Sequence, residues 1–284
     1  MSIETKKKMR KWLIIIVCFA IACIITCGGF FAYKLYKHEK NQAKDISDLN
    51  GQVYDLKGQI SLLNAKLAGR KESIIWDSGE YNYLAIGNSL TRHGACSYWW
   101  HSCNGMAASD LEHDYYHIVL RHLEQKHDKV HGEAVGLSTW EVQSHDRDET
   151  FFMFDPYLNE EIDLITIQLG ENAENLDTFE SDYESLIIYI KNKCPKARII
   201  IIGDFWAKAN RDELKIEAAS NTNVEYVSLE GIKDNKDYYA GMGTTVYDDD
   251  GNPHRIDHEG VAAHPGDNGM EAIAERVIAV IDKE

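Results

Sequence analysis

Three polar residues stand where a strand-like run ends or where the last helical run begins, and together they could carry out acyl transfer. Ser89 lies in the turn Gly-Asn-Ser-Leu-Thr after one apolar run, Asn172 follows a later run, and His264 precedes a Pro-Gly turn. A serine hydroxyl can attack a carbonyl carbon, a histidine can accept its proton, and an amide N–H can stabilise the oxyanion that forms. Each residue alone is more typical of a cap, a turn or a loop. If the fold brings the three together, they could form one site for nucleophilic attack on a carbonyl.

The surrounding pattern predicts the elements that would position these residues. Apolar runs alternate with helical stretches from about residue 80 onward, which indicates a parallel sheet covered by helices on both faces. The predicted strands are Tyr83–Ile86, Glu133–Leu137, Ile162–Leu169, Arg198–Gly203 and Val224–Leu229, and the predicted helices are 176–193, 208–220 and Met270–Ile281. In open sheets of this kind the site lies at the carboxyl ends of the strands. Ser89 and Asn172 follow strands at that edge.

In order and spacing, the three blocks resemble the SGNH (GDSL-like) hydrolase superfamily. The blocks are Gly87-Asn88-Ser89, the Gly-x-Asn that ends at Asn172, and His264-Pro265, and the resemblance covers about residues 80–284. It implies a flavodoxin-like three-layer α/β/α sandwich. It also implies that Ser89 is the nucleophile, His264 the general base and Asn172 an oxyanion donor. The expected enzyme is a carboxylic-ester hydrolase that needs no cofactor or metal and acts on an O-acylated glycan or a small ester.

Two blocks depart from the family in ways that affect the oxyanion donors. The first block usually reads Gly-Asp-Ser, and here Asn88 takes the place of the acid. The family also has a block after the second strand, here Ala134–Trp140 and called the second block, which usually supplies a glycine N–H. Gly136 is the candidate here, and if it stands too early the N–H of Thr139 or a neighbour takes the role.

The third departure concerns the acid that orients the histidine. The family usually has an Asp three residues before this histidine, and here that residue is Val261. Asp257 and Glu259 are the nearest upstream acids. Alternatively, a backbone carbonyl fixes the tautomer and leaves a Ser-His dyad. By analogy with triads, a missing acid lowers the rate without abolishing the chemistry.

The N-terminal segment has a different composition from the rest. Residues 12–33 form an apolar run of 22 residues without a charge, enough to span a hydrocarbon core about 30 Å thick. Residues 1–11 contain five Lys or Arg, which favours a cytoplasmic N-terminus. The sequence therefore predicts a single-pass cell-membrane protein with a transmembrane helix at 12–33. Its catalytic domain, residues 75–284, would be extracellular.

A heptad pattern within residues 41–70 predicts a coiled-coil stalk. Its apolar positions are Ile46, Leu49, Val53, Leu56, Ile60, Leu63 and Leu67. Leu at every d position and β-branched residues at the first three a positions favour a parallel homodimer. Gly51 and Gly58 fall at f, the outermost position. The alternative is an amphipathic helix docked on its own domain.

Charge and the remaining motifs limit the other possible functions. Residues 1–70 carry a net charge of +7 and the remainder −23, so the domain is poorly suited to nucleic acid. His113 and His117 stand at i, i+4 but without an H-E-x-x-H pattern, so no metal is expected. Residues 248–252 are interpreted as a hairpin turn, Trp99 and Trp100 as packing or as a sugar-binding floor, and pairing of Cys96 with Cys103 stays open. An O-acyltransferase and an inactive binding protein on the same fold are the alternative functions.

Overall fold

A computed structural model describes the backbone of residues 3–68, 72–143 and 146–283, and the side chains in these ranges from residue 33 onward. The contacts divide the chain into two units, residues 1–54 and 55–284. One helix, α1 (Ile3–Ala68), contains nearly all of the first unit and the start of the second. The α/β fold lies in the second unit.

The second unit is built on a five-stranded parallel sheet. Its strands are β1 (Tyr81–Gly87), β2 (Val130–Gly136), β3 (Leu164–Gln168), β4 (Arg198–Ile202) and β5 (Glu225–Val227). They lie in the order β2-β1-β3-β4-β5, and every neighbouring pair is parallel. This is the flavodoxin-like order, in which the ligand site lies at the carboxyl ends near β1 and β3. The predicted parallel α/β fold is confirmed, and each predicted strand overlaps an observed one.

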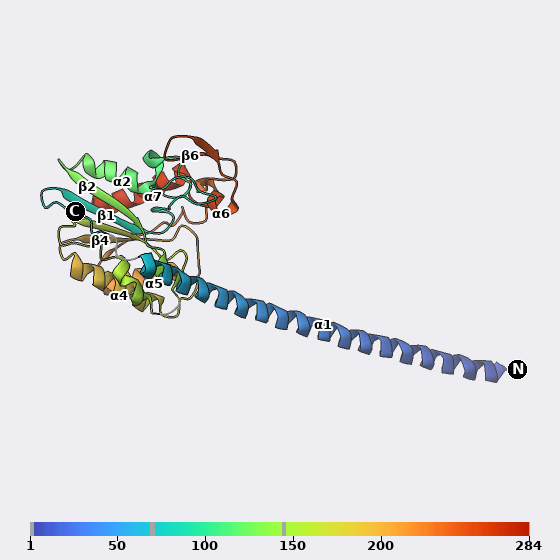
Figure 1. The fold of residues 1–284 in the computed structure, drawn as a ribbon. Coiled ribbons are helices and arrows are strands. Elements are labelled where there is room, and N and C mark those ends of the chain that lie inside the picture. Colours follow the sequence, from blue (N-terminus) through green and yellow to red (C-terminus); the bar gives the residue numbers. More distant parts are fainter. Residues whose placement is uncertain (1–2, 69–71, 144–145, 284) are drawn as a thin grey trace. The chain divides into compact units, whose positions relative to one another are not determined.

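Helices cover both faces of the sheet (Figure 1). Helices α2 (Tyr115–Glu124) and α7 (Asp267–Ile281) lie on one face, and α4 (Phe179–Lys193) and α5 (Arg211–Asn221) on the other. The shorter elements are α3 (Thr139–Val142), α6 (Glu259–Ala262), the 3-10 helices η1 (Leu111–His113), η2 (Arg147–Met153) and η3 (Lys236–Tyr238), and the hairpin strands β6 (Thr245–Tyr247) and β7 (Pro253–Arg255). The turn of this antiparallel hairpin is residues 248–252, as the sequence predicted.

The isoleucines of β4 explain why two cores form. Successive strand side chains point to opposite faces. Ile199 and Ile201 therefore pack into the core under α4 and α5, whereas Ile200 and Ile202 pack into the core under α2 and α7. A strand buried on both faces reads as a continuous apolar run, which is why it was visible in the sequence.

The predicted membrane location is wrong. Within the described residues, no helix combines the length and the apolar character needed to cross a membrane. From residue 33 onward α1 carries a polar or charged residue in every turn. This finding contradicts a single-pass membrane protein with an extracellular catalytic domain. The side chains of the predicted span, 12–33, lie outside the described residues as far as residue 32.

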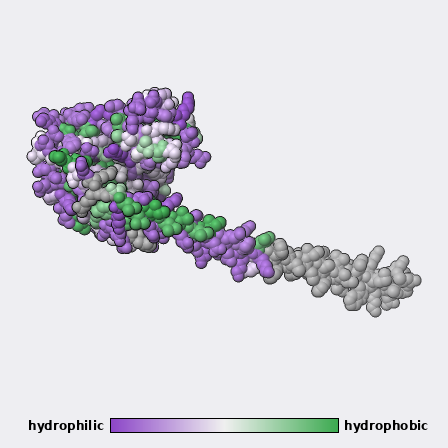
Figure 2. Space-filling view, viewed as in Figure 1, coloured by the Kyte–Doolittle hydropathy of each residue, from purple (hydrophilic) through white to green (hydrophobic). Residues whose placement is uncertain are grey.

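The coiled coil is not supported, although its helix is present. All seven apolar heptad residues are exposed, by 49% to 83%. Figure 2 shows hydrophobic residues on the described part of α1. The end of the helix instead contacts the domain through Gly58, whose carbonyl oxygen accepts a hydrogen bond from Gln143 Nε2 at 2.7 Å. The parallel homodimer stays a prediction.

Candidate active site

Ser89 lies in a tight turn at the carboxyl end of β1. A Cβ atom at Gly87 would lie 1.8 Å from Thr91 Oγ1, so only glycine fits before this turn. The Thr91 hydroxyl in turn shares a 2.6 Å hydrogen bond with Tyr115. The N–H of Leu90 donates to Asn88 Oδ1 at 2.9 Å, which closes the turn around Ser89. The motif Gly-Asn-Ser-Leu-Thr is thus one packed unit that fixes the serine at the sheet edge.

The structure brings Ser89 and His264 into direct contact. Ser89 Oγ lies 2.8 Å from His264 Nε2. His264 Nδ1 lies 2.7 Å from the carbonyl oxygen of Gly260, and because a carbonyl only accepts, Nδ1 carries the proton. Nε2 of the neutral ring then accepts the serine O–H. This arrangement is suited to general-base activation of a hydroxyl.

Neither upstream acid is the partner of His264 Nδ1. Asp257 and Glu259 are both exposed, and the nitrogen that an acid would bind is bound by Gly260. The backbone-carbonyl alternative is therefore the one that the structure shows. Val261, at the family's usual acid position, is buried and packs with Trp99 and Met106 in a small apolar cluster.

The surroundings of His264 keep its imidazole neutral. Burial lowers its pKa to about 4 from the ordinary 6.5, against the opposing effect of the hydrogen bond to Gly260. Trp206 packs against the ring at 4.8 Å in an edge-on geometry and donates from Nε1 to the Ala263 carbonyl at 3.0 Å. No motif in the sequence marks Trp206 as part of the site, because it lies on a different loop from His264.

Candidate oxyanion donors line one open cavity beside Ser89. The cavity has a volume of about 600 Å³, and Ser89, Gly136, Ser138 and Asn172 are among its lining residues. At Gly136 a Cβ atom would lie 2.7 Å from the carbonyl oxygen of Arg92, so glycine permits this close approach. Backbone N–H groups and an amide around one hydroxyl are suited to stabilising an oxyanion.

Thr139, the predicted substitute for Gly136, lies elsewhere. It begins α3, and its hydroxyl shares a 2.9 Å hydrogen bond with the hydroxyl of Ser61 on α1. Thr139 is not among the residues that line the cavity, whereas Gly136 and Ser138 are. The structure therefore favours Gly136 or Ser138 over Thr139 as the contribution of the second block.

One buried carboxylate that sequence reasoning missed joins two of the three blocks. Glu141, on α3, is fully buried. Its Oε1 accepts from Asn88 Nδ2 at 2.9 Å and from the Gly170 N–H at 2.5 Å, and its Oε2 accepts from Asn172 Nδ2 at 2.6 Å. The only sequence signal is an acid among apolar neighbours in Thr-Trp-Glu-Val.

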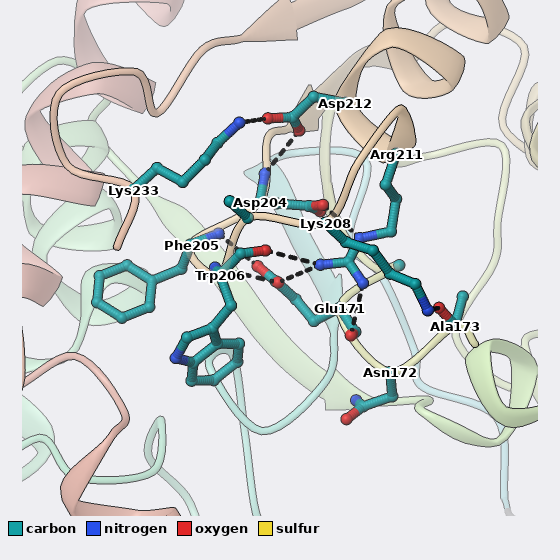
Figure 3. Close-up of polar contacts among 12 residues, drawn as sticks. Glu171, Asn172, Ala173, Asp204, Phe205, Trp206, Lys208, Arg211, Asp212 and Lys233 are labelled. Atoms are coloured by element: carbon teal, nitrogen blue, oxygen red, sulfur yellow. Dashed lines mark hydrogen bonds and ion pairs between the residues drawn. The ribbon is translucent and has the colours of Figure 1, made fainter. Parts of the chain in front are cut away.

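Beneath the site lies a cluster of buried ion pairs, shown in Figure 3. Arg211 binds Glu171 and Asp204, and Lys215 lies 2.6 Å from the second oxygen of Asp204. Burial raises the pKa of Glu171, as does the neighbouring charge of Asp204. Glu171 accepts the backbone N–H of Phe205 at 2.6 Å, so the cluster anchors the loop that presents Trp206 to His264.

The structure also shows where the remaining sequence candidates lie and what they contact. Trp99 is fully buried, and Trp100 stacks on His254 with 4.6 Å between ring centroids. His113 and His117 do not share a helix: η1 contains the first and α2 the second, and each binds an aspartate, Asp110 and Asp114 respectively. Cys96 and Cys103 are both exposed free thiols.

Several solved structures of esterases and lipases resemble this chain at low identity. A two-domain esterase active on acetylated mannans matches with a TM-score of 0.48 and 16% identity, over 72% of this chain and 50% of its own. A family two carbohydrate esterase from Clostridium thermocellum, in complex with cellohexaose, gives 0.43 and 18%, over 71% and 63%. A protein from Bacteroides uniformis described as a GDSL-like lipase gives 0.47 and 16%, over 72% and 97%.

Of these three, the Bacteroides uniformis protein has the GDSL-like description that the sequence motifs resemble. The chain spans about half the length of the two-domain esterase. No protein-family model and no curated protein matches the chain.

Proposed function

We propose that this chain is an SGNH-type serine esterase that hydrolyses carboxylic esters through a Ser89–His264 dyad. The observation that carries the proposal is the 2.8 Å contact between Ser89 Oγ and His264 Nε2, in which Nδ1 is committed to the Gly260 carbonyl. The fixed tautomer leaves Nε2 as a proton acceptor aimed at the hydroxyl. Two residues separated by 175 positions thus meet so that a histidine nitrogen can accept the serine proton, which activates the serine as a nucleophile.

The reaction follows from these contacts in two stages. Ser89 Oγ attacks the ester carbonyl carbon and gives its proton to His264 Nε2. The tetrahedral intermediate then expels the alcohol, which takes that proton, and Ser89 is left acylated. A water molecule gives a proton to His264 Nε2 and attacks the acyl-enzyme; the second tetrahedral intermediate expels Ser89 Oγ, which takes that proton back, and the acid is released. The Gly260 carbonyl accepts the Nδ1–H bond throughout and stabilises the imidazolium that forms in each stage.

The negative oxygen of each intermediate would be held by donors at the cavity wall. The Ser89 N–H, the amide of Asn172 and a backbone N–H at Gly136 or Ser138 are the candidates. Removal of one such donor typically lowers kcat by about 10²–10³-fold. An open cavity of about 600 Å³ beside Ser89 suits an acyl group on a bulky alcohol, such as an O-acylated glycan.

The test is ester hydrolysis by the full-length chain and by its Ser89→Ala variant. With p-nitrophenyl acetate we expect kcat to fall by roughly 10⁴-fold or more in the variant. Labelling of Ser89 by a fluorophosphonate, read by mass spectrometry, reports the activated serine without a turnover step. A chain that hydrolyses nothing but is labelled at Ser89 would favour acyl transfer to another acceptor. A chain that does neither would favour the binding protein.

A further inference from the structure

Glu141 is surrounded by hydrogen-bond donors in a way that suits a carboxylate. Its side chain is fully buried, and three N–H groups from two other segments point at its two oxygens. An ionised carboxylate accepts at both oxygens, whereas a protonated acid or an amide must place a donor at one of them. Burial raises the pKa of Glu141, and the bonds from Asn172, Asn88 and Gly170 act in the opposite direction.

The bond to Asn172 determines which end of that amide faces Glu141. The side chain of Asn172 is exposed, and in Figure 3 it points away from the ion cluster around Glu171. An amide can rotate about its last torsion and exchange its oxygen for its nitrogen. Because Glu141 Oε2 accepts from Nδ2 at 2.6 Å, the nitrogen is held on the Glu141 side of the amide of Asn172, a residue that lines the cavity beside Ser89. The rotated amide would place its oxygen against the Glu141 carboxylate, where two acceptors repel each other, so Glu141 fixes the orientation of the amide.

The bond to Asn88 explains the departure of the first block from the family. Asn88 donates from Nδ2 to Glu141 and accepts from the Leu90 N–H with Oδ1, so it uses both ends of its amide. An aspartate at this position could not donate, and its charge would lie about a hydrogen-bond length from the buried carboxylate of Glu141. The asparagine and Glu141 are therefore a matched pair, in which the acid stands just after the second block instead of in the first.

We infer that Glu141 is a positioning residue that orients the Asn172 amide as an oxyanion donor and couples it to the Ser89 turn through Asn88. This inference rests on the proposed esterase function. Glu141 touches no reacting atom, so it acts on kcat only through Asn172 and the turn. Misplacement of a catalytic group by about 1 Å can cost about 10²-fold in rate.

The first test is a double-mutant cycle on the full-length chain with p-nitrophenyl acetate. Glu141→Gln should lower kcat by about 10–100-fold with KM changed less than about twofold, because the donors lost act in the transition state. In an Asn172→Ala background the same substitution should lower kcat much less, because the amide that it orients is gone. An equal loss of kcat in both backgrounds overturns the inference. Asp163→Asn is the control, because Asp163 is an acid that accepts the backbone N–H of Asn82 at the opposite end of β1 from Ser89.

A second readout does not depend on activity. The side-chain amide of Asn172, observed by ¹⁵N NMR, should show one protected hydrogen in the wild type and lose that protection in Glu141→Gln. If the protection of the Asn172 amide hydrogen is the same in Glu141→Gln as in the wild type, the inference is contradicted, even in an active enzyme. The substitution could remove the protection in a chain that neither hydrolyses esters nor is labelled at Ser89. That result would support the Glu141–Asn172 contact and reject the esterase, so failure of the inference and failure of the proposed function can be told apart.

A third variant examines the matched pair. Asn88→Asp places a second carboxylate against Glu141 and should lower the unfolding midpoint in denaturant. Combined with Glu141→Gln, which removes the first carboxylate, the loss should be smaller than for Asn88→Asp alone. An identical loss in both backgrounds would show that the two side chains do not interact.

Discussion

His264 Nδ1 lies 2.7 Å from the carbonyl oxygen of Gly260, four residues earlier in the chain. The short helix α6 and the turn after it create this contact, because the Ala263 N–H donates to Glu259 and the His264 N–H donates to Val261. A neutral carbonyl fixes the tautomer as an aspartate would, but it adds no negative charge beside the ring. The basicity of His264 is therefore set mainly by its burial and not by an ion pair.

The first prediction concerns the pH dependence of the reaction. A general base works only when deprotonated, so kcat/KM should rise with pH through the pKa of His264, about 4, and level off above it. A profile with half-maximal kcat/KM near the ordinary 6.5 would contradict this. The stability should follow with a defined sign. Because the folded pKa lies below the unfolded one, the unfolded chain binds more protons, and the free energy of unfolding should fall as the pH is lowered from about 6.5 towards 4.

The second prediction concerns the cause of the lowered pKa. Trp206 covers one side of the His264 ring, so Trp206→Ala should admit water and move the acid limb of kcat/KM to higher pH. Trp206→Phe keeps an aromatic ring and loses only the bond to the Ala263 carbonyl, so its limb should stay nearer the wild-type position. The pair of profiles separates the two roles of this side chain. If the acid limb of kcat/KM stays at the same pH in Trp206→Ala, residues other than Trp206 must cause the desolvation of His264.

The third prediction concerns the glycine before the nucleophile turn. Gly87→Ala would place a methyl group 1.8 Å from Oγ1 and 2.6 Å from Cβ of Thr91, whose side chain is fully buried. We expect a loss of about 1–3 kcal/mol in the free energy of unfolding, measured in urea, because overpacked cores cost that amount. Gly94→Ala is the control, since its Cβ would have no atom within 4 Å. Equal unfolding midpoints for the two variants would refute the packing argument.

The fourth prediction concerns the exposed heptad face of α1. If two chains pair through it, Leu49→Ser with Leu56→Ser should convert a dimer into a monomer in sedimentation equilibrium, because both are d positions of the seam. Asp48→Ser, at an outward position, should leave the mass unchanged. A monomeric wild type would reject the homodimer. The domain contact does not compete with such pairing, because Gly58 lies at f, opposite the seam.

The strands were predictable because of how they are buried. Strand β4 is a run of isoleucines that face two cores, and only a sheet covered on both sides allows such a run. The positions of Ser89 and Asn172 at the sheet edge followed from the same pattern. Glu141 was not predictable, because its three donors come from segments 53, 29 and 31 residues away. For the partner of His264 Nδ1 the sequence left two alternatives, an upstream acid or a backbone carbonyl. It could not decide between them, because every residue type has a backbone carbonyl.

The contact at Gly58 links the end of α1 to the candidate active site, a link that the heptad spacing does not suggest. A Cβ atom there would lie 2.4 Å from the carbonyl oxygen of Val142, next in the chain to Glu141. Gln143 and Thr139, on either side, also bind this end of α1. The end of α1 therefore packs against the turn that contains Glu141, and an enzyme shortened to exclude α1 would lack this support. A fragment that begins after residue 68 could fold and still be slow, and its inactivity would say nothing about the whole chain.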